Sequence, residues 1–219
     1  MTSPLLAAAA RRRTAQTDPW QDKVVAHLRF DGNLIDLTGR VWTAYGNAAP
    51  TAAGHDQTAL ALDGVGDYLG TPATPDLDFG ATLDLTVEAW VYCTGGWGAS
   101  QPVFYCAAPG WAPGWLLYRN DSDSRLYFTP NGTERIQSSV IPAGTWAHVV
   151  ITRASGVWMM FIDGIKQPTT WASAAAFDGG AGFKLGGDAT SLYFKGRIDD
   201  FRLTRGVARY INTFTPTPY

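Results

Sequence analysis

The sequence has little charge, only two cysteines and no long apolar run, and each shortage excludes a class of protein. Charged residues make up 16% of the 219 residues, against about 25% in an average globular protein. The 17 Lys and Arg nearly balance the 19 Asp and Glu, so the chain lacks the excess positive charge of a broad nucleic-acid-binding face. No apolar run approaches the ~20 residues of a membrane-spanning helix. We therefore expect a protein that binds neither nucleic acid nor membrane.

The two cysteines, Cys93 and Cys106, end two strand-like runs at 85–93 and 102–106 that a glycine-rich turn separates. If these runs form a hairpin, Cys93 faces a position near Gln101 or Pro102, and Cys106 lies about four residues further along. At ~3.4 Å per residue, that separation is beyond the reach of a disulfide. The sequence thus predicts two reduced, half-buried thiols rather than an exported, disulfide-dependent domain.

The first 17 residues have the wrong order for a secretory signal. In a signal peptide the positive charges precede the apolar stretch, whereas here Leu5–Ala10 precedes Arg11, Arg12 and Arg13. We therefore expect no export signal, and we assign residues 1–19 to a short extended N-terminal arm. A polar arm without a core is ordered only when something holds it, so we predict that it docks on a neighbouring subunit, with the three arginines at the interface.

Aromatics (13%), 24 glycines and 13 prolines are abundant instead, as is typical of all-β proteins with many turns. From Trp20 onward, short runs alternate apolar and polar residues with the period of two that strands require. Asp163–Gly164 and Asn131–Gly132 are strong hairpin-turn signals. The strand-like runs lie at 24–30, 58–62, 67–70, 85–93, 102–106, 114–119, 124–128, 134–140, 145–153, 157–162, 183–186 and 193–204. This pattern predicts an antiparallel β-sandwich of jelly-roll type over residues 20–219.

Several longer motifs carry a family resemblance. They are HLRFDGNLIDLTGR (27–40), ALALDGVGDYL (59–69), LDLTVEAWVY (83–92), IPAGTWAHVVITRASGVWMMFIDGIKQ (141–167), FKLGG (183–187) and FKGRIDDFRLTRGVARY (194–210). In this order and spacing they resemble the concanavalin A-like lectin/glucanase superfamily, specifically its laminin-G-like jelly roll. The resemblance extends from Val24 to Tyr210. The ending, GRIDDFRLTRGVARY (196–210) followed by FTPTPY (214–219), resembles the version found in bacteriophage virion proteins, which implies a location in the virion after synthesis in the host cytoplasm.

The motifs are explained by folding better than by catalysis. In the run 85–93, alternation places Val87 and Ala89 on one face and Glu88 and Trp90 on the other. We expect Trp90 and Trp146 to serve the scaffold by burying large side chains. The resemblance therefore gives a fold before it gives an activity.

The sequence offers no catalytic constellation. Glucanases of this fold place several carboxylates at alternating positions of one strand, and a retaining pair lies ~5–5.5 Å apart. Here Glu88 stands alone, while Asp199 and Asp200 are adjacent and should point to opposite faces of a strand. The three histidines lack metal-ligand spacing, and we expect His148 to be a sheet residue. We therefore predict that the chain is not an enzyme.

The resemblance also implies a structural calcium ion, which many domains of this kind hold with aspartates and carbonyl oxygens. The candidate ligands are Asp31 and Asp36 near the first strand, with Asp199 or Asp200 near the last. Calcium requires six to eight oxygen ligands, which Asp-rich turns can supply. The alternative is that these aspartates cap turns through their own backbone.

A glycan-binding surface is the third possibility, since sugars stack on flat aromatic faces. The segment 95–118 places tryptophans among Gly and Pro, a composition typical of surface loops. One of them, Trp115, is expected to begin a strand and enter the core. The alternative is that the loop tryptophans pack over the sandwich edge or against another subunit. The candidate ligand-binding residues are Trp97, Trp111, Asn120, Asp121, Asp123 and Trp171.

Two functional hypotheses follow. In the first, the chain is a non-catalytic structural or assembly protein of a bacteriophage virion, such as a capsid decoration or tail/baseplate component. Its partners are then other virion subunits, in a homo-oligomer or a larger assembly. In the alternative, it is a carbohydrate-binding receptor-recognition module that attaches to host surface polysaccharide.

Overall fold

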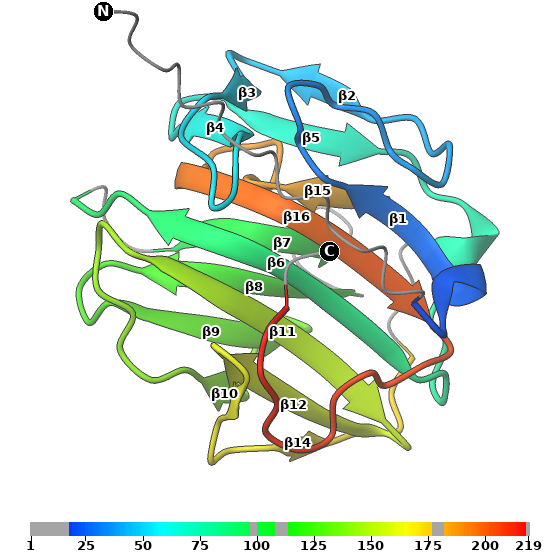
Figure 1. Cartoon of the computed structure of the whole chain (residues 1–219). Coiled ribbons are helices and arrows are strands. Elements are labelled where there is room, and N and C mark those ends of the chain that lie inside the picture. Colours follow the sequence, from blue (N-terminus) through cyan, green and yellow to red (C-terminus); the bar gives the residue numbers. More distant parts are fainter. Residues whose placement is uncertain (1–17, 97–99, 108–113, 177–181, 218–219) are drawn as a thin grey trace, which may run out of the picture.

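The period-two pattern of the sequence forms two antiparallel sheets that pack face to face (Figure 1). The computed structural model describes residues 18–96, 100–107, 114–176 and 182–217. Besides strands, these residues include two short 3-10 turns, η1 (Gln21–Lys23) and η2 (Pro75–Leu77). The predicted all-β, antiparallel jelly-roll sandwich is confirmed.

Sheet A has the spatial order β13-β12-β11-β6-β16-β4-β3, with β1 paired to β16 and β14 paired to β12. Its strands are β1 (Val24–Leu28), β3 (Ala49–Thr51), β4 (Ala59–Asp63), β6 (Leu85–Cys93), β11 (Trp146–Ala154), β12 (Val157–Ile162), β13 (Ile165–Lys166), β14 (Trp171–Ala172) and β16 (Lys195–Arg205).

Sheet B has the order β10-β9-β8-β7-β15-β5-β2. Its strands are β2 (Thr43–Tyr45), β5 (Tyr68–Thr71), β7 (Gln101–Ala107), β8 (Gly114–Asn120), β9 (Arg125–Pro130), β10 (Ile136–Gln137) and β15 (Phe183–Leu185). The short strands β2, β3, β13 and β14 were absent from the sequence-based prediction, because two or three residues are too few to show alternation.

The core lies between the two sheets and is built from alternate residues of each strand. Val87 and Ala89 of β6 face inward, and Trp115 of β8 meets them from sheet B in the same buried cluster. Trp115 is fully buried, as predicted, and its ring lies 5.7 Å from that of Phe183, nearly perpendicular to it. Burial of such aromatic side chains is a leading contribution to the stability of a sandwich.

The two cysteines correct one prediction and confirm another. Strands β6 and β7 do not form a hairpin, because β6 belongs to sheet A and β7 to sheet B. Neither Cys93 nor Cys106 forms a disulfide, as predicted, but both are fully buried rather than half-buried. Spacing alone could not distinguish two strands in different sheets from two strands of a hairpin.

The alternation along β16 is interrupted between Asp199 and Arg202. Asp200 has a φ of 47°, and the pairing register to β6 shifts at this point, as at a β-bulge. The simple expectation that Asp199 and Asp200 alternate across a regular strand is therefore wrong. Both aspartates are buried.

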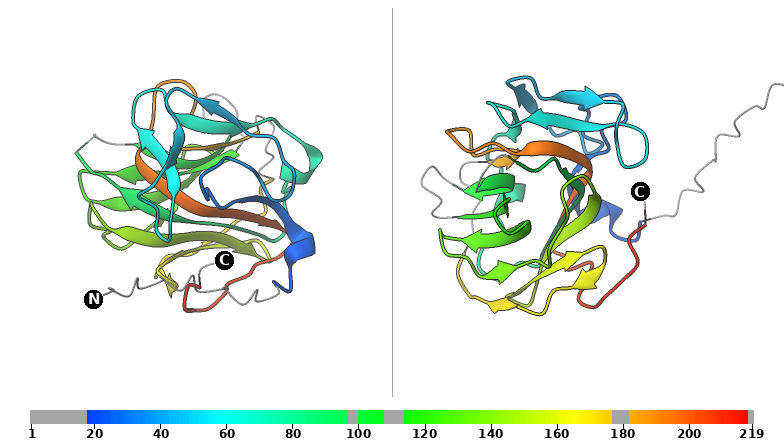
Figure 2. Two further views of the ribbon diagram at one scale, coloured as in Figure 1. Left: turned by 45° about the horizontal axis from the view of Figure 1, so that its top comes forward. Right: turned by 90° about the vertical axis from the view of Figure 1, so that its left-hand side faces the viewer.

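The C-terminal segment 206–217 crosses the outer face of sheet A, over β11 and β12 in Figure 1 and on the outer side of the sheet in the right-hand view of Figure 2. Tyr210 and Phe214 stack with ring centroids 3.7 Å apart and pack against Val150 and Phe161. The Phe214 N–H donates to the Gly164 carbonyl at 2.9 Å. This segment thus gives part of the outer face of sheet A a second layer.

Residues 1–17, including Arg11, Arg12 and Arg13, lie outside the described residues, so the docking arm stays a prediction. The first described residue, Asp18, is attached to the sandwich. Its carboxylate accepts hydrogen bonds from Arg202 at 3.2 Å and from Arg209 at 2.9 and 2.7 Å. These bonds fix the point at which the chain enters the domain.

Candidate functional site

Three aromatic side chains meet on the outer face of sheet A, beyond the part that the C-terminal segment covers. Trp90 and Tyr92 project outward from β6, since Ala89 and Val91, the residues that alternate with them along the strand, face the core. Trp146 begins β11 directly opposite Tyr92 in the ladder, and their rings lie 5.4 Å apart. Directly opposed aromatic pairs stabilise antiparallel sheets, but here all three rings also remain partly exposed.

A loop residue completes this group. His55, between β3 and β4, stacks on Trp90 with centroids 3.5 Å apart and planes 10° apart. It also meets Trp146 edge to face at 6.0 Å. We call Trp90, Tyr92, Trp146 and His55 the outer-face aromatic cluster. It presents partly exposed aromatic surface, which suits contact with the apolar face of a ligand.

Asp199 holds the His55 loop on the sheet. Its Oδ2 accepts a hydrogen bond from the His55 N–H at 2.8 Å, and in the ladder Asp199 lies opposite Trp90. Burial raises the pKa of the Asp199 carboxyl, while backbone N–H donors, that of His55 first among them, act in the opposite direction. The carboxylate is therefore a buried anchor that places the imidazole over the indole.

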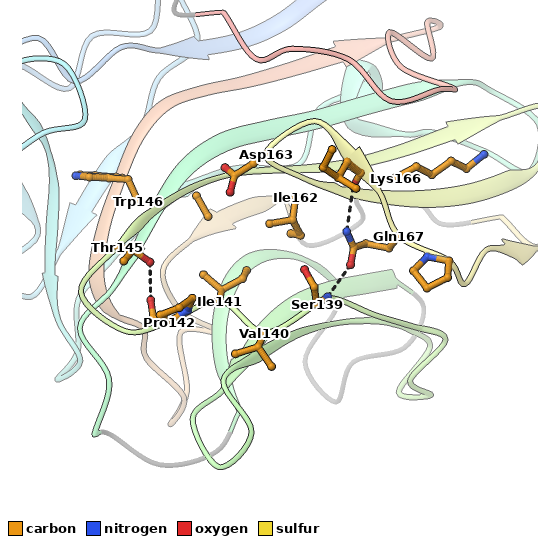
Figure 3. A pocket seen from close by; sticks show the side chains of 13 residues that line it. Ser139, Val140, Ile141, Pro142, Thr145, Trp146, Ile162, Asp163, Lys166 and Gln167 are labelled. Atoms are coloured by element: carbon orange, nitrogen blue, oxygen red, sulfur yellow. Dashed lines mark hydrogen bonds between the residues drawn. The ribbon is translucent and has the colours of Figure 1, made fainter.

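A pocket of about 400 Å³ lies beside Trp146 (Figure 3). It separates the loop at 139–145 from the β12–β13 hairpin. Its apolar surface includes Ile141 and Ile162, and Asp163 and Lys166 line it as charged groups. Ligand pockets are of this kind, mostly apolar with a few placed polar groups, and range over about 300–1,000 Å³.

Internal hydrogen bonds fix the shape of this pocket. The Gln167 side chain accepts from the Ser139 N–H at 2.6 Å and donates to the Ile165 carbonyl at 3.0 Å. On the opposite side, Thr145 Oγ1 donates to the Pro142 carbonyl at 2.7 Å. Figure 3 shows both sets of bonds. Trp146 lines the pocket and belongs to the aromatic cluster, so the two form one continuous candidate site.

Glu88 is a structural residue in this arrangement. It is fully buried on the outer side of β6, where its Oε1 accepts hydrogen bonds from Arg202 at 2.9 and 2.7 Å. Its Oε2 accepts from the Tyr210 hydroxyl at 3.0 Å. His148, as expected, is a residue of strand β11, and its Nε2 lies 3.5 Å from Glu88 Oε2. A carboxylate closed off in this way stabilises the fold and has no access for a substrate.

Those ligand-binding residues predicted from sequence that the structure describes do not lie at this site. Trp97 and Trp111 lie outside the described residues. Asn120 ends β8, and Asp121 and Asp123 lie in the turn between β8 and β9. Their side chains accept local hydrogen bonds: Asn120 from Ser122, Asp121 from Arg119 and Asp123 from Tyr127. Trp171 lies opposite Trp158 in β14, with the guanidinium of Arg135 5.4 Å from its ring centre.

The four candidate calcium ligands have protein donors around them. Asp36 accepts hydrogen bonds from the His27 N–H, the Thr38 N–H and hydroxyl, and the Trp42 indole N–H, so it caps its turn. The Arg29 guanidinium lies 3.2 Å from Asp31 and 3.9 Å from Asp200. In the part of the chain that the structure describes, no three His, Cys, Asp or Glu residues are placed to hold one metal ion.

The sequence contained a signal for the site that the prediction did not use. Alternation in 85–93 placed Trp90 and Tyr92 on the face opposite the core, where large aromatic residues have no need to lie. We had expected Trp90 and Trp146 to be buried scaffold, but both are partly exposed on the outer face. His55 carried no signal, because a loop residue is brought over the sheet only by the fold.

The two antiparallel layers define a lectin-type β-sandwich, and comparison with known proteins agrees. The chain belongs to the concanavalin A-like lectin/glucanases superfamily, whose family profile matches residues 63–208. No curated protein is a significant sequence match. Within the described residues, no helix has the length and apolar character to cross a membrane.

Solved structures share the fold at low sequence identity. The binding domain of Paraclostridial Mosquitocidal Protein 1 matches with a TM-score of 0.68 and 15% identity, over 88% of this chain and 50% of that one. Domain 4 of AbnA, a GH43 extracellular arabinanase from Geobacillus stearothermophilus solved with arabinotriose, matches with a TM-score of 0.62 and 21% identity, over 84% and 93%. Trypanosoma rangeli sialidase matches with a TM-score of 0.61 and 15% identity, over 88% and 31%. The chain thus spans about half of the first of these structures.

Proposed function

We propose that this chain is a non-catalytic carbohydrate-binding module and that the outer-face aromatic cluster and the adjoining pocket hold the sugar. The observation that carries the proposal is the position of Trp146, which is partly exposed, contacts Tyr92 and His55, and lines the pocket beside it. An indole in that position offers an apolar face to a sugar ring, while the Asp163 carboxylate, which lines the same pocket, offers hydrogen-bond acceptors to its hydroxyl groups.

Two further observations support this function. Among the proteins of similar fold, an arabinanase domain is described in complex with arabinotriose, and cell entry of botulinum neurotoxin type C is described as dependent on interaction with two ganglioside molecules. The buried Glu88, paired with Arg202, leaves no accessible acid at the centre of the sheet. Binding without catalysis is therefore the function that the arrangement favours.

The test is binding of the purified chain to a panel of bacterial and plant polysaccharides. Trp146→Ala should weaken the binding by about tenfold or more, because the stacking surface is lost. Trp171→Ala is the matched control, since Trp171 is also a partly exposed tryptophan of sheet A but lies away from the cluster. Equal losses in both variants, or a loss only in Trp171→Ala, would contradict the assignment of the site.

A structural role in a bacteriophage virion is the second candidate, favoured by the resemblance of residues 196–210 to virion proteins. In that setting the chain is made in the host cytoplasm, and residues 1–19 contact other subunits of the particle. Deletion of residues 1–17 should then prevent incorporation into particles while leaving sugar binding intact. A structural calcium ion remains a proposal as well, tested by whether EDTA lowers the midpoint of thermal unfolding.

A further inference from the structure

Arg197 lies beside the aromatic cluster, with its guanidinium over one of the cluster's rings. Its guanidinium carbon lies 4.5 Å from the ring centre of Tyr92, and its Nη1 donates one hydrogen bond, of 3.3 Å, to the Ala53 carbonyl. Among the described residues, no carboxylate lies within ion-pair distance of this guanidinium. By contrast, Arg202 and Arg209 lie within 3.2 and 2.7 Å of Asp18.

The position of Arg197 in the sheet explains why its charge is not neutralised. Its neighbours in the ladder are Tyr92 on β6 and Ala61 on β4. The one acidic residue of β4, Asp63, lies opposite Lys195 instead. Arg197 therefore lies between an aromatic ring and a methyl group, and it is partly exposed.

An arginine held in this way is preorganised for an anion. The Tyr92 ring and the Ala53 carbonyl restrict the guanidinium, so less rotamer entropy is lost when a ligand binds. A guanidinium has five N–H donors in a planar fork. The single hydrogen bond from Arg197 to the Ala53 carbonyl therefore leaves other N–H donors for a second partner. Planar, charge-assisted pairs of this kind are about twice as strong as neutral hydrogen bonds.

We propose that the site prefers negatively charged sugars and that Arg197 recognises their anionic group while the aromatic cluster contacts the sugar ring. This inference rests on the proposed carbohydrate-binding function and names its ligand class. The shared chemistry is a carboxylate or sulfate carried on a sugar. Arg197 acts here as the specificity-determining residue.

Two ligand pairs that differ in charge test the preference. Trigalacturonate and its methyl ester differ in the charge of the carboxyl groups, and 3′-sulfolactose and lactose differ in one sulfate. We expect at least one acidic member to bind the wild-type chain about fivefold or more tightly than its neutral partner. This ratio should fall at high salt, because the ion pair is partly exposed. The pair that shows the difference distinguishes a carboxylate from a sulfate.

Arg197→Gln should reduce the acid-to-neutral ratio to near one, and Arg197→Lys should restore only part of it, since an ammonium lacks the planar fork. Arg135→Gln is the matched control, because Arg135 also lies over an aromatic ring, that of Trp171, away from the site. The proposal is overturned if the neutral partners bind the wild type as tightly as the acids, or if Arg135→Gln removes the preference equally. If no member of the polysaccharide panel and neither pair binds, the carbohydrate-binding function fails together with it.

Discussion

At the scale of single residues, Glu88 shows how one outward position of a strand becomes a buried charge. Alternation along β6 directs Glu88 away from the core, and the C-terminal segment then covers it. The carboxylate is tolerated there because Arg202 and Tyr210 donate three hydrogen bonds to it. Removing one member of such a pair leaves the other charge buried and uncompensated, which costs more than the pair itself contributes.

Glu88→Gln should therefore lower the free energy of unfolding by about 2 kcal/mol, because the Arg202 guanidinium loses its fully buried counter-ion and keeps only Asp18, at 3.2 Å. The measurement is urea unfolding at neutral pH. Asp22→Asn is the matched control, since Asp22 and Lys23 form an ion pair whose side chains are 71% and 52% exposed. Exposed pairs contribute less than about 1 kcal/mol. Similar small effects in both variants would show that Glu88 is not the centre of a closed network.

Single residues also show how far the sequence predicts the site. The outward direction of Trp90 follows from a period of two and can be read directly. The contact of Trp146 with Tyr92 requires the register between β6 and β11, which brings together residues more than fifty positions apart in the sequence. The stacking of His55 on Trp90 requires a loop to fold over the sheet and be held by Asp199. Each of these three features depends on packing over a longer range than the one before. Local sequence patterns carry no information about such packing.

At the scale of elements, two hairpin turns with the same local chemistry have different surroundings. Asn131–Gly132 and Asp163–Gly164 both have positive φ at the two turn residues, as the sequence predicts. A Cβ added to Gly132 meets nothing within 4 Å, whereas one added to Gly164 collides with the Phe214 carbonyl. The turn in β12–β13 is thus also the attachment point of the C-terminal segment, a role that no turn signal contains.

Comparison of Gly164→Ala with Gly132→Ala should isolate that attachment. Both variants pay for an alanine at positive φ, about 1 kcal/mol each. Gly164→Ala should cost clearly more, because the added methyl displaces Phe214 and breaks its hydrogen bond to Gly164. Limited trypsin digestion should then cut faster after Arg205 or Arg209 in Gly164→Ala alone. Equal stability and equal digestion of the two variants would mean that the segment is not held through this turn.

At the scale of the whole molecule, the sequence predicts where the longer strands form but not which sheet each one joins. The run 85–93 and the run 102–106 look like consecutive strands of one hairpin, yet β6 and β7 lie in opposite layers. Strand alternation is the same in either arrangement, since each strand of a sandwich needs only one apolar face. Only the packing of the two layers decides, and the strand pattern carries no information about it.

The two thiols make this layered arrangement measurable. Cys93 is buried in sheet A and Cys106 in sheet B, and burial raises the pKa of the Cys93 thiol to about 11. A buried, protonated thiol does not react with an aromatic disulfide reagent. Labelling therefore requires the two sheets to separate. We therefore expect both cysteines to be unreactive in the native protein at pH 8.

Single-cysteine variants, Cys93→Ala and Cys106→Ala, should be labelled at similar slow rates that rise together with urea, because each rate follows the opening of the sandwich rather than a local motion. Thr94→Cys in the cysteine-free chain is the matched control, since Thr94 adjoins Cys93 in the sequence but is exposed, and it should react at once. If one buried thiol reacts much faster than the other without denaturant, the sheet that carries it opens by itself. The two layers would then be separate units of stability, contrary to the single core that joins them.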